Sequence, residues 1–398
     1  MYAFVLIALL AADPAPQAAA PAAPTVSPTP REAAKNFAED VKLLFKVAAC
    51  GRMDVPLGTI DERAVNGHCA DLQPLIDHYT KFWSENIEPL LAQIVPREKA
   101  TTVVYPFGGG DLVTALGTYP NVSDLTTLSL EVVGDVRGFT KLTPAQLKTE
   151  LQTARKNLEL LYRVKHSKTD NLGDMTRGGL SGQLVFALTA LRLRGYEPVA
   201  LRYFTVNDQG ALDFLSDDDV KQNDAALAEK KIKEREHTFA FGNAEIEYRR
   251  VGETQTRFFR HMGANLDDEH LAKTPGIMTF LEKKGRVFAM TKAASYLLWW
   301  PQFGKVRDYL SKNVDYMISD STGLPPDIAT QNGFRQYTFG DFAGPYLNDA
   351  NARVAELFKD MWKKQPKRPM GFRYGYPDVE KNAHMLVTTK LEWNEPKK

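Results

Sequence analysis

The sequence predicts an α/β protein with a mostly parallel sheet, a pair of N-terminal helices and an antiparallel insertion. Short runs of β-branched and aromatic residues alternate with amphipathic helical stretches along most of the chain. Two runs of alternating polarity, separated by Val251-Gly252-Glu253, interrupt that rhythm and indicate a hairpin. Hydrophobic residues make up 43% of the chain and charged residues 25%, which is enough apolar material for a full core.

Length and charge narrow the possibilities further. The 398 residues could form two or three domains, but the alternation of strands and helices continues to the end, so we expect one α/β domain over residues 101–398. The 50 Lys and Arg residues balance 49 Asp and Glu residues, for a net charge of +1. This balance lacks the basic excess of nucleic-acid-binding proteins, and we predict no nucleic-acid partner.

The first residues indicate export. Residues 1–12 are all apolar, which is shorter than the roughly 20 residues of a membrane span but suits the core of a signal peptide. The basic leader that normally precedes such a core is missing, so a buried helix remains the alternative. Residues 13–30 are mostly Ala and Pro and indicate an extended linker. We therefore predict a periplasmic or extracellular protein without an integral membrane span.

Residues 31–100 are predicted to form a helical N-terminal element. Apolar residues recur at helical spacing in 31–49 and again in 71–95. The segment between them holds both cysteines of the chain, Cys50 and Cys69, which are 19 positions apart. A disulfide is expected if the protein is exported, and two free thiols if it is cytosolic. The cysteines and scattered histidines have no recognisable ligand spacing, so no metal site is predicted.

The predicted α/β domain follows in chain order. Strands are expected from residue 102 to the glycines that follow it, and at 125–130, 198–206, 286–290, 314–319, 334–339, 372–374 and 384–389. Helices are expected from residue 111, at 144–163, 180–193 and 351–364, and at 296–310 with a break at Pro301. Residues 207–275 are treated as an insertion or a sheet extension, with a solvated helix at 216–236 and a hairpin of 244–250 with 254–261.

The strongest candidate site is a glycine-rich turn. The run Thr102–Pro106 is followed by Gly108, Gly109 and Gly110, a helix then begins at Asp111, and the next apolar run ends on Glu131. Glycines allow backbone amides to approach a ligand, and strand tips in an open α/β sheet border a crevice. The alternative is that these glycines only make a tight turn, with Asp111 capping the helix.

A second candidate lies at the tip of the strand 314–319. Asp320 and Ser321 follow it directly and would face the same functional edge of the sheet. If Glu131 and Asp320 converge, the two carboxyl groups could catalyse hydrolysis. The alternative is a turn that caps the helix begun by Pro325 or Pro326.

The glycine turn and the acid that follows it resemble two large groups of proteins. Glu131 lies 23 positions after Gly108, which is similar to the ribose-binding acid of dinucleotide-binding folds and to the first strand, turn and helix of Rossmann-like methyltransferases. The contiguous glycines, and Asp111 at the helix start, depart from a pyrophosphate-binding turn.

A wider resemblance covers most of the chain after residue 45. The motif Tyr105-Pro106-Phe107-Gly108-Gly109-Gly110-Asp111, the segment 126–135 and the C-terminal segments 320–323 and 372–376 are similar to a family of uncharacterised exported bacterial proteins. This resemblance implies export and a single α/β unit. It implies no activity and no cofactor, because the family has no assigned activity.

Three functional hypotheses follow. The first is an exported protein that binds a small ligand at Gly108–Asp111, Glu131, Asp320 and Ser321. The second is an enzyme at the same place, either a carboxylate-dependent hydrolase or an S-adenosylmethionine-dependent methyltransferase. The third is a noncatalytic envelope interaction protein. The sequence names no cofactor.

Overall fold

The structure is a computed structural model, and it describes residues 29–164, 169–345, 347, 349–375 and 384–393. The predicted signal segment (1–12) and almost all of the predicted linker (13–30) lie outside these residues. The described chain starts on the sheet: the Thr29 amide donates to Asp213, and the Arg31 guanidinium pairs with Glu245 and Glu247.

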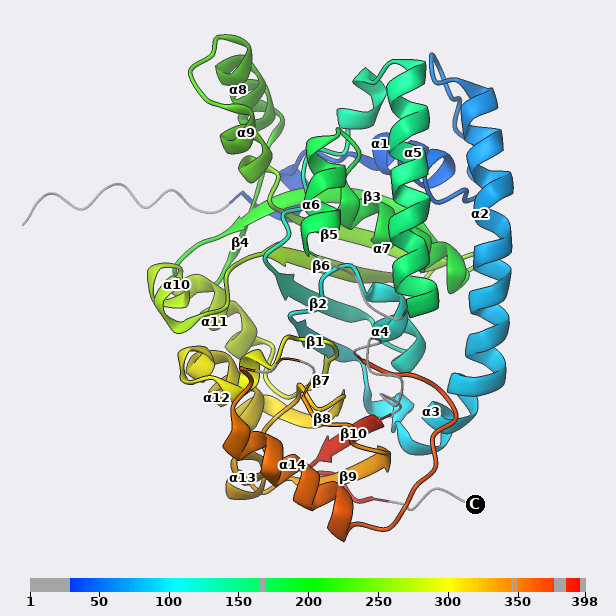
Figure 1. Ribbon diagram of the computed structural model, residues 1–398. Coiled ribbons are helices and arrows are strands. Elements are labelled where there is room, and N and C mark those ends of the chain that lie inside the picture. Colours follow the sequence, from blue (N-terminus) through cyan, green and yellow to red (C-terminus); the bar gives the residue numbers. More distant parts are fainter. Residues whose placement is uncertain (1–28, 165–168, 346, 348, 376–383, 394–398) are drawn as a thin grey trace, which may run out of the picture.

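The centre of the molecule is a mixed sheet of ten strands (Figure 1). Its order is β4-β3-β5-β6-β2-β1-β7-β8-β10-β9. The strands are β1 (Thr102–Pro106), β2 (Asp124–Ser129), β3 (Tyr196–Val206), β4 (Leu212–Phe214), β5 (Asn243–Arg250), β6 (Thr256–Gly263), β7 (Val287–Thr291), β8 (Val314–Ser319), β9 (Arg335–Gly340) and β10 (His384–Thr389).

Only the middle of the sheet is parallel. Strands β6, β2, β1, β7 and β8 run parallel, whereas β4, β3 and β5 on one side and β10 and β9 on the other pair antiparallel. The expectation of a mostly parallel sheet is therefore right for the centre and wrong for the edges. The predicted hairpin exists as β5–β6, and it extends the sheet because β6 also pairs with β2.

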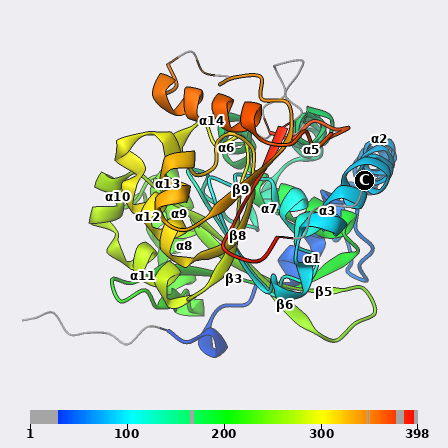
Figure 2. The same ribbon diagram turned by 90° about the horizontal axis from the view of Figure 1, so that it is seen from below.

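Helices cover both faces of the sheet (Figure 2). On one face, a hydrophobic core lies between the sheet and α1, α2, α4, α5 and α7. On the other face, a second core lies between the sheet and α10 to α13. The helices are α1 (Ala38–Val47), α2 (Glu62–Phe82), α3 (Glu88–Ile94), α4 (Leu112–Thr118), α5 (Pro144–Glu159), α6 (Thr169–Arg177), α7 (Gly182–Leu193), α8 (Asp217–Ala228), α9 (Glu234–Ala240), α10 (Asp268–Lys273), α11 (Pro275–Lys283), α12 (Gly304–Asn313), α13 (Pro326–Gln331) and α14 (Ala352–Lys364).

Several predicted elements have different bounds in the structure. The helix expected at 216–236 is two helices, α8 and α9, which project from the body in Figure 1. The break expected at Pro301 within the helical segment 296–310 is confirmed: two short 3-10 turns precede α12. The strand expected at 372–374 is not formed; Tyr374 makes only an isolated bridge.

The disulfide predicted from the cysteine spacing is present. Cys50 and Cys69 are bonded, with their Cα atoms 5.5 Å apart. Helix α2 begins at Glu62, earlier than expected, so Cys69 lies within the helix and the bond ties it to the end of α1.

Removing this disulfide should destabilise the fold. A crosslink that closes a loop of this length contributes about 3 kcal/mol, mainly by restricting the unfolded chain. We expect Cys50→Ala/Cys69→Ala to lose that amount in urea unfolding, and reduced wild-type protein to match it. Two titratable thiols in the unreduced, denatured wild type would show that the bond does not form in solution.

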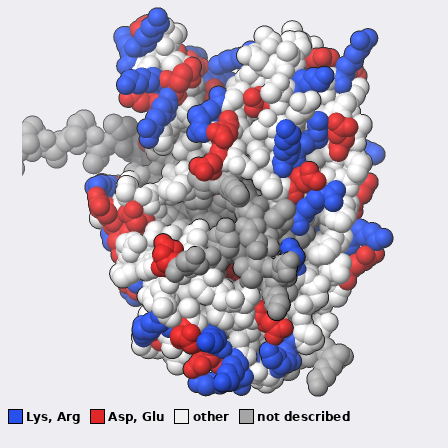
Figure 3. Space-filling model, in the orientation of Figure 1, with Lys and Arg blue, Asp and Glu red and all other residues white. Residues whose placement is uncertain are grey.

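The surface agrees with the balanced composition. On the face in Figure 3, basic and acidic side chains are intermixed rather than gathered by sign. Among the described residues, no helix combines the length and apolarity needed to cross a membrane.

Candidate functional site

The sheet contains a topological switch point between β1 and β7. The chain passes from β1 to β2 on one side, and β7 pairs with the other side of β1. The central strands β6-β2-β1-β7-β8 thus have the 3-2-1-4-5 order of doubly wound sheets, in which ligands bind at the switch point outside the carboxyl ends of the strands.

The three glycines of the turn have packing reasons to be glycine. A Cβ on Gly108 would lie 3.0 Å from the Tyr105 ring, and a Cβ on Gly110 would lie 2.6 Å from the Phe186 ring. Gly109 has a φ of +50°, which favours glycine. The turn therefore needs these glycines whether or not a ligand binds beside it.

Asp111 precedes α4 as predicted, but its side chain makes no cap hydrogen bond. It is buried and pairs with Lys292, with 2.5 Å between Asp111 Oδ2 and Lys292 Nζ. Thr114 Oγ1 donates to Asp111 Oδ1 at 2.6 Å, and Tyr105 Oη donates to Asp111 Oδ2 at 3.2 Å. The capping role expected of Asp111 is therefore wrong: its carboxylate joins the β1 turn to the tip of β7.

Backbone strain gathers at the same two loops. Phe107, after β1, has a φ of +61°, and Ala293, Ser295 and Tyr296, after β7, have φ values of +53°, +48° and +58°. Each such non-glycine residue costs of order 1–3 kcal/mol, and strain of this kind clusters at functional sites. The two loops that meet at the switch point are thus held in costly conformations.

Asp320 holds the loop after β7. Its buried carboxylate accepts hydrogen bonds from Ala293 N (2.9 Å) and Thr322 N (2.8 Å), and also from the Thr322 hydroxyl. Burial raises the pKa of Asp320, while these donors act in the opposite direction. Three of the roughly four acceptor positions of the Asp320 carboxylate are therefore used to hold this loop.

Ser321 is buried against His384 at the start of β10. The Ser321 amide donates to His384 Nε2 at 3.2 Å, and Ser321 Oγ lies 2.9 Å from the same nitrogen. An amide N–H can only donate, so Nε2 is the acceptor and the neutral ring carries its proton on Nδ1. Nδ1 is buried and has no partner among the described residues.

Two buried histidines should make the fold sensitive to acid. Burial lowers the pKa of His68 and of His384 to about 4, from about 6.5 when unfolded. Folding therefore favours the neutral rings. The contribution of these rings to the free energy of unfolding is fully present above pH 6.5, and it is lost as the pH falls from 6.5 to 4. The loss is at most about 3 kcal/mol for each histidine.

We expect His384→Phe, which keeps a ring and removes the titration, to lose less stability between pH 7 and pH 4.5 than wild type in urea unfolding. His78→Gln, at an exposed position, is the control and should follow the wild-type curve. Identical pH dependence of wild type and His384→Phe would contradict this prediction.

Glu131 lies just beyond β2 and is 7% exposed. Its Oε2 atom is buried without a hydrogen-bond partner among the described residues. The preceding residue, Leu130, is 61% exposed, so an apolar side chain borders this acid at the surface. A buried carboxylate oxygen without a donor is costly, and such groups in native proteins call for an explanation.

Glu131 and Asp320 follow different strand tips. They come after β2 and β8, whose axes are three strand spacings apart, or about 14 Å. The carboxyl pairs of glycoside hydrolases lie about 5–9.5 Å apart. The hydrolase hypothesis therefore requires the two side chains to reach toward each other across the tips of β1 and β7.

Other polar atoms without partners, within the part of the chain that the structure describes, lie along the same edge of the sheet. The last residues of β2, β7 and β8 each carry a buried hydroxyl of this kind, as does Tyr374. These three strand-end residues are Ser129, Thr291 and Ser319. Because more than nine tenths of buried polar groups are normally paired, these atoms call for an explanation, of which bound water is one.

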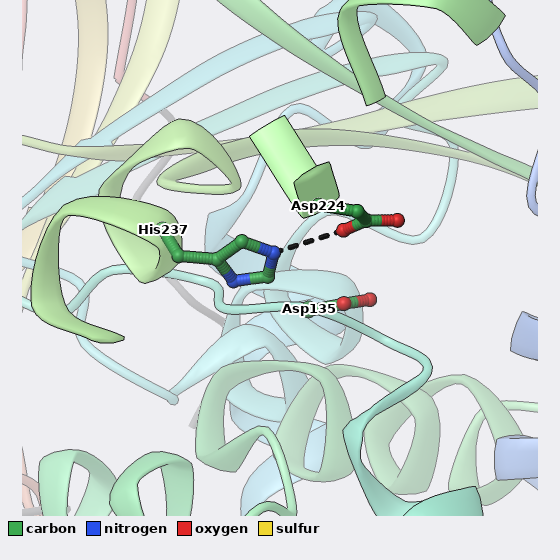
Figure 4. A group of neighbouring side chains, drawn as sticks. All are labelled: Asp135, Asp224 and His237. Carbon is green, nitrogen blue, oxygen red and sulfur yellow. Dashed lines mark hydrogen bonds and ion pairs between the residues drawn. The ribbon is translucent and has the colours of Figure 1, made fainter. Parts of the chain in front are cut away.

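Asp135, Asp224 and His237 form the one group within the described residues with the spacing of a metal site (Figure 4). Arg137 already supplies a cation there: its guanidinium donates to both carboxylates at 2.7–3.1 Å, and it lowers the pKa of Asp224 to about 2. His237 Nε2 completes the group at 2.9 Å from Asp224 Oδ1. This group of ion pairs and hydrogen bonds therefore joins the segment after β2 to α8 and α9.

The structure adds three residues that the sequence reasoning did not single out. Lys292 directly follows a buried strand, and that position alone could have marked it. His384 and His261 gave no local signal, because their partners are 63 and 130 residues away.

Comparison with protein families, characterised proteins and solved structures finds no match to this chain. The function is therefore inferred from the geometry of the site.

Proposed function

We propose that this is an exported protein that binds a small ligand carrying a ribose-like diol at the switch point between β1 and β7. The unpartnered Glu131 Oε2 carries the proposal. In doubly wound folds, the acid at the tip of the second strand accepts hydrogen bonds from ribose hydroxyls. A diol would supply the donors that this buried oxygen lacks.

Two further features support binding at this place. The strained loops after β1 and β7 border the switch point, and the unpaired hydroxyls of β2, β7 and β8 lie along the same edge. Export is supported by the Cys50–Cys69 disulfide, since such bonds persist in oxidising compartments. A free nucleoside suits that setting better than an intracellular dinucleotide.

A methyltransferase remains the second candidate because the central strands have the doubly wound 3-2-1-4-5 order, with Glu131 after the second of them. The first strand, the glycine turn and the acid after the second strand resemble those of methyltransferases that use S-adenosylmethionine. This likeness concerns topology, and topology alone does not assign a reaction.

Thermal melts of the full chain with adenosine, S-adenosylmethionine and NAD test both candidates. We expect adenosine to raise the melting temperature in a saturable way, and Glu131→Gln to weaken its binding about 10- to 100-fold, the range for hydrogen bonds to a charged group. Without ligand, Glu131→Gln should melt close to the wild-type temperature, because the two side chains have nearly the same shape.

The control is Glu98→Gln. Glu98 is exposed and precedes β1, whereas the glycine turn follows it, so this variant should bind like wild type. A shift with S-adenosylmethionine but not with adenosine would favour the methyltransferase. No saturable shift with any of the three compounds would refute the proposed site.

A further inference from the structure

His261 lies beneath Glu131, at the end of β6. It is buried, and its register partner on β2 is Thr127. His261 Nε2 lies 2.7 Å from the carbonyl oxygen of Glu131, and Nδ1 lies 2.8 Å from Thr127 Oγ1. A carbonyl oxygen can only accept, so Nε2 carries the proton and Nδ1 accepts from the Thr127 hydroxyl. Both ring nitrogens therefore have defined roles.

These contacts fix the path of the chain after β2. The backbone crosses the tip of β6, where Ala264 N donates to the Ser129 carbonyl at 2.7 Å. A Cβ on Gly263 would lie 3.1 Å from the Glu131 carbonyl oxygen, so glycine suits this close approach. Further on, Val133 N donates to the carbonyl of Gly242, which precedes β5, at 3.0 Å. His261 makes a side-chain hydrogen bond to the backbone of Glu131 in this crossing.

We propose that His261 is a positioning residue for ligand binding: its Nε2–H orients the backbone of Glu131 so that the free carboxylate oxygen meets the ligand hydroxyls. This inference rests on the proposed function. It assigns His261 no contact with the ligand and no proton transfer.

The test compares His261→Leu with His261→Gln in the full chain, with adenosine as the probe and calorimetry as the measurement. Gln keeps an N–H donor at similar reach, whereas Leu removes it. We expect His261→Leu to bind adenosine about tenfold more weakly, the factor for one hydrogen bond. His261→Gln should stay within about threefold of wild type. If His261 had only a structural role, the two variants would differ in melting temperature. Equal melting temperatures, with adenosine affinity retained in His261→Gln alone, indicate the positioning role.

A second pair of variants covers the case in which His261→Leu does not fold. Thr127→Val removes the hydroxyl that fixes Nδ1, and we expect it to weaken adenosine binding. Thr126→Val is the matched control, because the neighbouring Thr126 hydroxyl is buried without a partner. It should bind like wild type.

Wild-type affinity in His261→Leu, or in Thr127→Val if His261→Leu does not fold, would overturn the positioning role. If Glu131→Gln still loses binding in that case, the proposed function stands. If wild type and Glu131→Gln both fail to bind adenosine, the proposed function and this inference fall together.

Discussion

Asp111→Leu should destabilise the protein by about 3–5 kcal/mol, because it leaves the buried Lys292 ammonium without its partner. Among the described residues, the Thr114 hydroxyl, 3.1 Å from Nζ, would remain as the hydrogen-bond partner of Lys292. Lys292→Met should be destabilising for the converse reason. Urea unfolding at pH 7 measures both effects.

The double variant Asp111→Leu/Lys292→Met is the informative control. Replacing a buried ion pair by apolar side chains of similar size is often neutral or stabilising. We therefore expect the double variant to recover most of the stability lost in each single variant, which gives a large coupling energy in the cycle. Simply additive losses would show that the two residues do not act as a pair.

Asp320→Asn should have the second largest effect, a loss of about 2–3 kcal/mol. The carboxylate accepts from two backbone amides and a hydroxyl, all of which are donors. An Asn side chain would turn its own NH₂ toward one of them, so at least one buried donor loses its acceptor. Urea unfolding again measures the change, and ligand melts should show weaker adenosine binding.

Ala293→Gly tests whether Asp320 acts by holding the strained loop. Glycine adopts positive φ without the Cβ penalty, so this variant should gain about 0.5–1 kcal/mol and offset part of the Asp320→Asn loss. Ala225→Gly, in the middle of α8, is the matched control and should lose a similar amount. A loss of stability in Ala293→Gly would mean that the loop is not strained.

The elements at the centre of the sheet were predictable for a local reason. Strands buried on both faces are continuous apolar runs; β1 begins at the predicted residue 102, and β8 has the predicted bounds. The antiparallel edge formed by β10 and β9 was not predictable as an edge, because their runs are similar and only the pairing of β10 with β8, and of β9 with β10, sets their direction.

Three acids of the candidate site have different surroundings in the structure. Glu131 Oε2 is without a hydrogen-bond partner among the described residues, whereas Asp111 and Asp320 are engaged by Lys292 and by the Ala293 loop. The glycines are needed for close packing and a left-handed φ. Each of these outcomes depends on which strand tips are neighbours, and that information is not local.

By itself, the sequence determined most strands and helices of the α/β body and the edge of the sheet where polar residues gather. These follow from periodicity and the residue types at strand ends, all of which act over a few residues. Only the tertiary structure decided that Asp111 pairs with Lys292, 181 positions away, and that His261 donates to the Glu131 carbonyl. The order of strands brings these side chains together, and their burial then makes every unpaired donor or acceptor costly.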